Sequence, residues 1–130
     1  MIYVTGSLNT DLCISSSRMP ETGETITGNG FMANGGGKGA NQATAAAKLG
    51  GKTAMCGVVG GDAFGEKLIC DLSAAGVDVS HVRKETGVSS GTAVIIVTEG
   101  NNRIILDKGA NAFLTKADID RFIQNAKSGD

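Results

Sequence analysis

Hydrophobic positions along the chain alternate between the spacings that are typical of strands and of helices. Short apolar runs at Ile2–Thr5 and Thr53–Val59 predict buried strands, and Gly60-Gly61 ends the second run. Between the two runs, Gly39–Leu49 is rich in alanine, which predicts a helix whose small side chains allow close packing on a sheet. The glycines that follow, Gly50-Gly51, suit the left-handed end of a helix. The predicted order is therefore strand, helix, strand.

Two further helices are indicated by capping residues that precede apolar positions at helical spacing. Asp62 is placed to cap a helix that ends at Gly76. The sequence Thr115-Lys116-Ala117-Asp118 is a capping box with Asp in place of Glu, and it predicts a third helix. Strands that alternate with helices of this size predict an α/β domain with a mainly parallel sheet flanked by helices.

Two segments, residues 11–34 and 91–107, break this alternation. The first is rich in turn-forming residues and lies between the first strand and the first helix. The second contains two β-rich runs, Thr92–Val97 and Arg103–Leu106, and the Gly100-Asn101-Asn102 sequence between them predicts a hairpin turn. We expect both segments to form a small accessory β sheet beside the α/β body. Such a sheet would serve as a lid over a site or as a contact between two copies.

Composition excludes several classes of function. The 130 residues suffice for one domain, and 12 Lys and Arg against 13 Asp and Glu give a net charge of −1, which disfavours nucleic acid or anionic lipid as a partner. No apolar run is long enough to span a bilayer, and Met1–Gly6 lacks the charged start of a signal peptide. Three cysteines without a Cys-x-x-Cys pair fit a reducing cytoplasm and disfavour zinc. The only histidine, His81, is expected at the surface of a polar, lid-like stretch.

The segment Gly35–Gly37 carries the strongest chemical signal. Glycines directly before a helix leave backbone N–H groups open to the oxygen atoms of a ligand. Lys38 adds a positively charged donor, and Asn41 adds an amide one turn into the helix. These residues predict a cradle for a polar ligand. The alternative is a tight turn into an alanine-rich helix, to which neither Lys nor Asn would contribute packing.

Known phosphate-binding loops match this segment poorly. A P-loop requires Ser or Thr where this chain has Gly39, and a glycine where it has Met32. The dinucleotide-binding pattern fits loosely as Gly35-x-Gly37-x-x-Ala40, but the loop does not leave the first strand directly, as a Rossmann turn does. A dinucleotide-binding domain is therefore the weakest alternative.

The longer motif around this loop resembles the N-terminal signature of the ribokinase-type, or PfkB, carbohydrate kinases. The residues that carry the resemblance are Gly36-Gly37-Lys38-Gly39-Ala40-Asn41-Gln42-Ala43, Gly50 and Gly60, together with Asn9-x-Asp11, Gly23-Glu24-Thr25 and Gly61-Asp62-x-Phe64-Gly65. The resemblance covers essentially the whole chain, and the Gly-Gly-Lys-Gly-Ala-Asn form is most similar to ribokinases within the family. It implies a ribokinase-like α/β fold of which residues 1–130 are the N-terminal part, with lid segments at about 11–34 and 91–107.

The resemblance also implies a function, namely the sugar-binding part of an ATP-dependent kinase that phosphorylates a hydroxymethyl group of a pentose such as ribose. A sugar needs short polar groups that converge on adjacent hydroxyls, and Asp11 is the candidate to accept from two of them. The implied substrate-binding residues are Asn9, Asp11, Gly36, Gly37, Lys38 and Asn41. For Asn9 and Asp11 the alternative is a structural turn after the first strand.

The resemblance places ATP, Mg²⁺, the activating monovalent cation (K⁺) and the catalytic aspartate in a C-terminal half. The corresponding signature, Asp-Thr-x-Gly-Ala-Gly-Asp, does not occur here, and Ser128-Gly129-Asp130 is no substitute. We therefore expect no catalytic, cofactor-binding or metal-binding residue in this chain, and no activity from it alone. A homodimer through the lid sheet is expected, and a non-catalytic sugar-binding or dimerisation module is the main alternative function.

Overall fold

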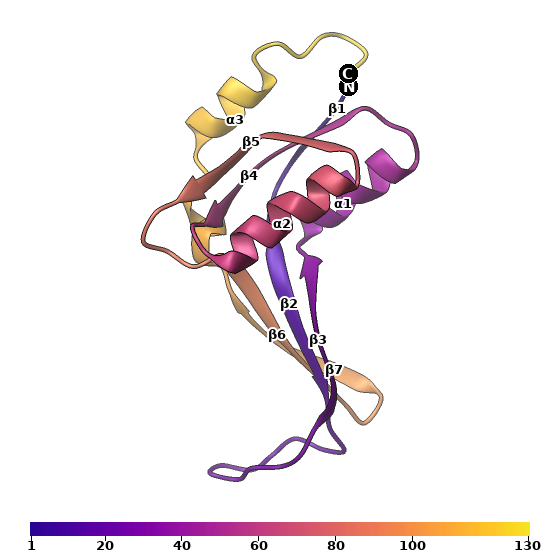
Figure 1. Ribbon diagram of the computed structural model, residues 1–130, viewed down its shortest axis with the longest axis vertical. Coiled ribbons are helices and arrows are strands. Elements are labelled where there is room, and N and C mark those ends of the chain that lie inside the picture. The colour runs from indigo at the N-terminus through magenta and orange to yellow at the C-terminus, as the bar shows by residue number, and fades with distance from the viewer.

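The computed structural model describes residues 1–130, and its strands form two separate sheets (Figure 1). The central sheet is parallel in the order β1-β4-β5, from β1 (Ile2–Thr5), β4 (Thr53–Gly60) and β5 (Val77–Glu85). The accessory sheet has the order β3-β2-β6-β7, from β2 (Asn9–Ser15), β3 (Asn29–Gly36), β6 (Gly91–Thr98) and β7 (Asn101–Asp107). The helices are α1 (Lys38–Lys48), α2 (Ala63–Ala74), α3 (Lys116–Ile123) and the 3₁₀ helix η1 (Gly109–Phe113). None of them combines the length and the apolar character that crossing a membrane would need.

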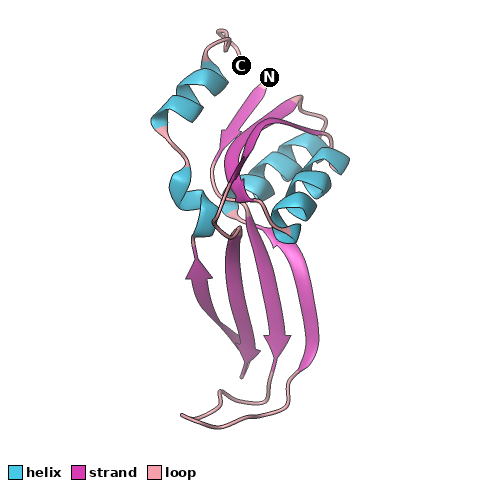
Figure 2. Cartoon of the chain, turned by 60° about the vertical axis from the view of Figure 1, so that its left-hand side comes forward, coloured by secondary structure: helices cyan, strands magenta, loops and turns pink.

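Helices cover both faces of the central sheet, with α1 and α2 on one face and α3 and η1 on the other (Figure 2). All eight residues of β4, the middle strand, are therefore buried. Met55 and Val59 belong to the apolar cluster beneath α1 and α2, whereas Ala54 and Cys56 pack with Phe122 of α3. The predicted mainly parallel α/β architecture with an accessory sheet is confirmed.

The alanine-faced helix α1 packs very closely on the central sheet. Ala40 and Ala43 are buried, and a Cβ atom on Gly39 would lie only 2.8 Å from the backbone of Gly6. Only glycine at this position allows the two backbones to approach so closely. The helix ends as predicted, because Gly50 adopts a φ of 88°.

The start of α2 is joined to the link between the two sheets. The Asp62 carboxylate accepts hydrogen bonds from Gly65 N at 2.8 Å, Ser90 N at 2.8 Å and Ser90 Oγ at 2.6 Å. Burial raises the pKa of Asp62, but the hydrogen bonds from Ser90 and Gly65 outweigh it and bring the pKa below its ordinary value. The predicted cap therefore has a second role, which is to hold the connection between β5 and β6.

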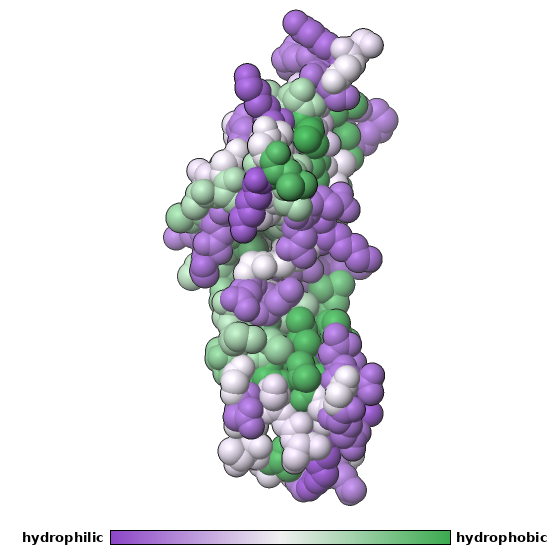
Figure 3. All heavy atoms as spheres, turned by 90° about the vertical axis from the view of Figure 1, so that its right-hand side faces the viewer, coloured by the Kyte–Doolittle hydropathy of each residue, from purple (hydrophilic) through white to green (hydrophobic).

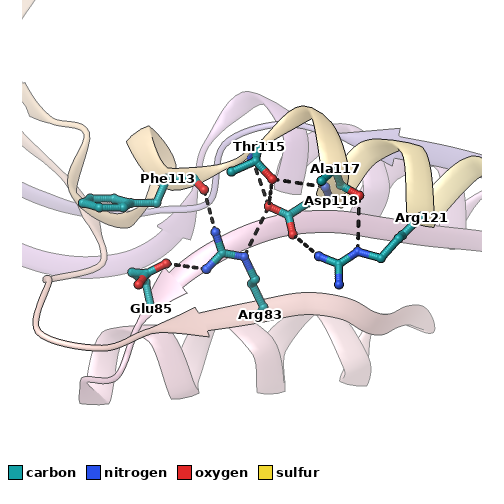
Figure 4. A network of polar contacts seen from close by, with 7 residues as sticks. All are labelled: Arg83, Glu85, Phe113, Thr115, Ala117, Asp118 and Arg121. Atoms are coloured by element: carbon teal, nitrogen blue, oxygen red, sulfur yellow. Dashed lines mark hydrogen bonds and ion pairs between the residues drawn. The ribbon is translucent and has the colours of Figure 1, made fainter.

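Helix α3 is fastened to β5 through one buried carboxylate (Figure 4). Asp118 accepts from Thr115 N at 3.0 Å, which completes the predicted capping box, and also from Thr115 Oγ1 at 2.7 Å. It accepts from Arg121 at 2.7 Å and from Arg83 at 3.3 Å as well. The hydrogen bonds from Thr115, followed by the contact with Arg83, lower the pKa of Asp118 to about 2. Arg83 also donates to the Phe113 carbonyl at 2.6 Å, which ties β5 to η1.

Strand β5 was not predicted from the hydrophobic pattern. A register shift opposite Ala54–Cys56 adds a residue to β5, so its buried residues Val77 and Val82 are five positions apart and break the alternation. His81 lies on this strand of the central sheet. Its side chain is exposed, as expected, but its assignment to a lid-like stretch is wrong.

The accessory sheet projects away from the body and consists of two hairpins joined through a parallel β2–β6 pair (Figure 1). The β6–β7 turn lies at Glu99 and Gly100, whose φ angles are 52° and 75°. Two successive positive φ angles fit the twist of a tight hairpin. The turn therefore begins one residue earlier than the predicted Gly100-Asn101-Asn102, and Asn101 and Asn102 already belong to β7.

Candidate functional site

Two of the predicted site residues, Asp11 and Gly36, meet on neighbouring strands of the accessory sheet. Asn9 pairs with Gly36 and Asp11 with Asn34, so these four residues share one face of the sheet. A Cβ atom on Gly36 would lie 2.1 Å from Asp11 Oδ2. The carboxylate therefore lies directly over the bare α-carbon of Gly36, in space that any other residue would fill.

The Asp11 carboxylate is half-buried and is not engaged by the rest of the chain. No donor of the chain hydrogen-bonds to it, and burial raises its pKa above the ordinary value. A carboxylate that has lost part of its water without gaining a donor has spare capacity to accept hydrogen bonds. This feature favours a ligand that brings hydroxyl or amine donors.

Asn9 lies two residues before Asp11 on the same face, and it is buried. Its Oδ1 accepts a hydrogen bond from Asn111 Nδ2 at 2.9 Å. Gly91 of β6 pairs with Asn9 from the other side and carries no side chain that would separate the two amides. Asn9 and Asp11 thus place an amide and a carboxylate side by side at the end of the accessory sheet that joins the body.

The glycine loop connects this face to α1. Gly37 has a φ of 93° and precedes the first residue of the helix, and a Cβ atom on it would lie 2.5 Å from the Ser7 carbonyl oxygen. Lys38 is exposed in the first turn of α1, and Asn41 is exposed one turn further on. The glycine loop therefore leads directly into the helix that carries Lys38 and Asn41, and its backbone is held against Ser7 by the hydrogen bond from Ala40 N to Ser7 O.

The six predicted residues do not all border one hollow. Asn41 and Gly36 help to line a hollow of about 300 Å³ between α1, α2 and β3, whereas Asp11 is not part of its lining. Asn9, Asp11 and Gly36 instead gather on the accessory-sheet face. The Gly36-Gly37 backbone connects the sheet face to Lys38 and Asn41 of α1.

Three residues that sequence reasoning did not assign to the site lie beside Asp11 and Asn9. Asn34 and Ala93 pair with Asp11 from its two neighbouring strands, and Asn111 contacts Asn9. Only strand register brings Asn34 and Ala93 there, and the hydrophobic pattern does not specify register. A signal existed for Asn111, because the turn-forming residues Gly109 and Asn111 follow shortly after the β-rich run Arg103–Leu106.

A second polar hollow, of about 360 Å³, lies between β5 and α3 and has a different character. Its lining consists of Ser80, His81, Arg83, Asp118, Arg121 and Gln124. Both arginines are already hydrogen-bonded to Asp118. The polar residues around this hollow therefore serve to hold α3 against β5.

Comparison with known proteins identifies the family of this chain. A family model described as pfkB family carbohydrate kinase matches residues 1–130. The chain belongs to the pfkB family of carbohydrate kinases. This pfkB chain is 45% identical over 116 residues to the ribokinase of Bacillus subtilis, a match that covers 89% of the chain and 40% of that protein. It is 43% identical over 127 residues to a deoxyribokinase of Salmonella typhi, which covers 97% of the chain and 42% of that protein.

A solved structure supports the same relationship. The Arabidopsis thaliana ribokinase complexed with ribose and ATP superposes with a TM-score of 0.79 at 38% identity, over 85% of this chain and 36% of that one. The fold is therefore ribokinase-like, and the predicted resemblance is confirmed. The pfkB chain spans about two-fifths of the length of these relatives and corresponds to their N-terminal part.

Proposed function

We propose that this chain is the sugar-binding portion of an ATP-dependent carbohydrate kinase, most like ribokinase, that transfers the γ-phosphate of ATP to a hydroxymethyl group of a pentose. The observation that carries the proposal is the half-buried Asp11 carboxylate, which lies over Gly36 and has no donor within the chain. The similarity to ribokinases and a deoxyribokinase, one ribokinase being complexed with ribose and ATP, supports a pentose.

In this proposal the sugar lies against the accessory-sheet face that carries Asp11. The Asp11 carboxylate accepts from two neighbouring hydroxyls, and the Asn9 amide donates to an adjacent oxygen. The bare backbone at Gly36 and Gly37 lets the ring approach closely, while Lys38 and Asn41 approach from the start of α1. Buried Ala93, which pairs with Asp11, supplies a small apolar surface for the carbons of the ring.

The same carboxylate argues against a phosphate group in this place. A negative charge directly over Gly36 repels an anion, whereas neutral hydroxyls are attracted as donors. The geometry therefore favours a polyol over a dinucleotide. A non-catalytic sugar-binding module would use the same contacts, and only turnover separates it from a kinase.

The proposal places the sites for ATP, Mg²⁺ and K⁺ outside the residues of this chain. No group of three or more His, Cys, Asp or Glu side chains is placed to hold a metal ion. We propose that these groups bind to the part of a complete kinase that the chain does not span. Solved ribokinase relatives include one with ADP and one with ATP. On this proposal the chain alone positions the acceptor sugar and transfers no phosphate.

We also propose that the accessory sheet mediates a homodimer. Apolar side chains gather on the half of the molecule that the sheet forms (Figure 3). The exposed ones are Phe31, Met32, Val94, Ile104, Ile105 and Leu106. A sheet with this much exposed apolar surface and two open edges is suited to pairing with a second copy.

A cytoplasmic location completes the proposal. Cys13, Cys56 and Cys70 are all free thiols, which suits a reducing compartment. ATP, the proposed phosphate donor, would be consumed in the same compartment.

The decisive experiment measures ribose-dependent ADP release and ribose binding by the complete gene product, with and without Asp11→Asn. We expect phosphorylation of ribose, and a fall of about 100-fold in kcat/KM in the variant through the KM for ribose, because two hydrogen bonds to a charged group are weakened. Asp120→Asn, an exposed residue of α3, is the matched control. Binding without turnover would support the non-catalytic module, and an unimpaired Asp11→Asn variant would remove Asp11 from the site.

A further inference from the structure

Asn111 connects two parts of the chain that enter and leave the accessory sheet. It lies in η1, directly after β7, and its side chain reaches the residues that precede β2. Asn111 Oδ1 accepts from Leu8 N at 2.9 Å, and Asn111 Nδ2 donates to Leu8 O at 2.9 Å and lies 3.1 Å from the Lys108 carbonyl oxygen. Leu8 itself is fully buried, so this pair of hydrogen bonds is partly shielded from water.

The Leu8 backbone leaves Asn111 only one orientation. An N–H group needs the amide oxygen and a carbonyl needs the amide nitrogen, so a flipped Asn111 would oppose like groups at both contacts. The Asn111 Nδ2 atom therefore faces Asn9, at 2.9 Å, and the atom of Asn9 that meets it must be an acceptor. Asn9 Oδ1 is therefore the atom that accepts the hydrogen bond from Asn111.

The nitrogen of Asn9 is then left for another partner. Asn9 Nδ2 has no acceptor within the chain. If it were fully buried, it would be a buried polar atom without a hydrogen bond, but Thr98 Oγ1 is the only side-chain atom of that kind. Asn9 Nδ2 is therefore reachable from outside, on the face that it shares with the Asp11 carboxylate. An N–H donor beside a free acceptor is the pair that a sugar hydroxyl, itself both donor and acceptor, would fit.

Gly91 provides the room for this arrangement. A Cβ atom at this position would lie 2.1 Å from Asn111 Nδ2 and 2.4 Å from Asn9 Oδ1. Even alanine would therefore push the two amides apart. The contact between Asn9 and Asn111 therefore depends on the missing side chain of Gly91.

We propose that Asn111 is a positioning residue for the sugar, which fixes the Asn9 side chain with its NH₂ group toward the ligand. The inference rests on the proposed function, since it deepens the account of the same site. Without Asn111, the Asn9 amide turns freely and presents an oxygen beside the Asp11 carboxylate for part of the time, which a hydroxyl tolerates less well.

The test measures the Kd for ribose, and the KM values for ribose and ATP, in the complete gene product. We expect Asn111→Ala to weaken ribose binding about tenfold, the usual effect of one lost hydrogen bond, and to leave the KM for ATP unchanged. Gly91→Ala should have a similar effect, whereas Asn102→Ala, an exposed residue of β7, should have none. If Asn111→Ala does not fold, Asn111→Asp keeps its shape and the bond from Leu8 N while removing the donor to Asn9.

A double-mutant comparison separates positioning from a merely structural role. In an Asn9→Ala background, Asn111→Ala should cost no further ribose affinity, although it still lowers the unfolding temperature. An equal loss of affinity in both backgrounds, or no loss when Asn9 is present, overturns the inference and leaves the proposed function intact. If the unaltered protein binds no ribose, the proposed function fails, and this inference fails with it.

Discussion

The Asp11 carboxylate lies over the α-carbon of Gly36, so close that a Cβ atom there would come within 2.1 Å of Asp11 Oδ2. The two residues are on adjacent strands, and the bare α-carbon is what gives the carboxylate its place. The geometry of the candidate site therefore depends as much on a missing side chain as on a charged one.

Gly36→Ala should displace the Asp11 carboxylate and raise the Kd for ribose at least tenfold, since a methyl group cannot share its space. The neighbouring Gly35→Ala is the matched control, because a Cβ atom there meets Leu68 at an ordinary 3.5 Å. Calorimetric titration of both variants with ribose checks the prediction. Equal affinities in the two variants would contradict it.

The Asp118 carboxylate should stabilise the fold in a pH-dependent way. Its pKa is lowered from 3.8 to about 2. The contribution of the ionised carboxylate to the free energy of unfolding is therefore complete above about pH 4 and is lost as the pH falls through 2. Asp118→Asn should reduce the free energy of unfolding by about 2 kcal/mol at pH 7 and by nearly nothing at pH 2. Urea unfolding at both pH values checks this, with exposed Asp120→Asn as control. A loss that is the same at both values would show that the charge is not responsible.

Asp62 and Ser90 should be energetically coupled, because the Asp62 carboxylate accepts two hydrogen bonds from Ser90. It also accepts the capping hydrogen bond from Gly65 N at the start of α2. Asp62→Ala should destabilise the protein by about 2–3 kcal/mol. Ser90→Ala should lower the free energy of unfolding less in the Asp62→Ala variant than in the unaltered protein. Thermal unfolding of the single and double variants checks this. Ser73→Ala, at an exposed position of α2, is the near-neutral control. Strictly additive losses would argue that the two residues act separately.

Ile105 should contribute to the proposed dimer, since its side chain is 73% exposed on the sheet face opposite Asp11. Ile105→Lys should convert a dimer into a monomer in sedimentation velocity and leave ribose binding intact, because charge is costly in an apolar interface. Leu49→Lys, at an exposed position beyond the end of α1, should leave the dimer unchanged. A monomeric unaltered protein, or a dimer that survives Ile105→Lys, would exclude this interface.

Elements with a clear local signal could be predicted. Apolar runs, alanine content and caps at Asp62 and Thr115 are properties of neighbouring residues, so they specify β1, β4 and the three helices without knowledge of the rest. Strand β5 was not predicted, because its register shift changes which of its residues face the core. Such a shift arises only from pairing with β4.

The amino-acid sequence by itself determined the fold class, the glycine loop before α1 and most of the residues proposed to meet a sugar. Only the tertiary structure decided which of them meet: strand register sets Asp11 over Gly36, and Asn111 reaches Asn9 across 102 positions of the chain. The reason is physical. Helix and strand preferences depend on residues a few positions apart, whereas register and long-range hydrogen bonds depend on how the whole chain packs.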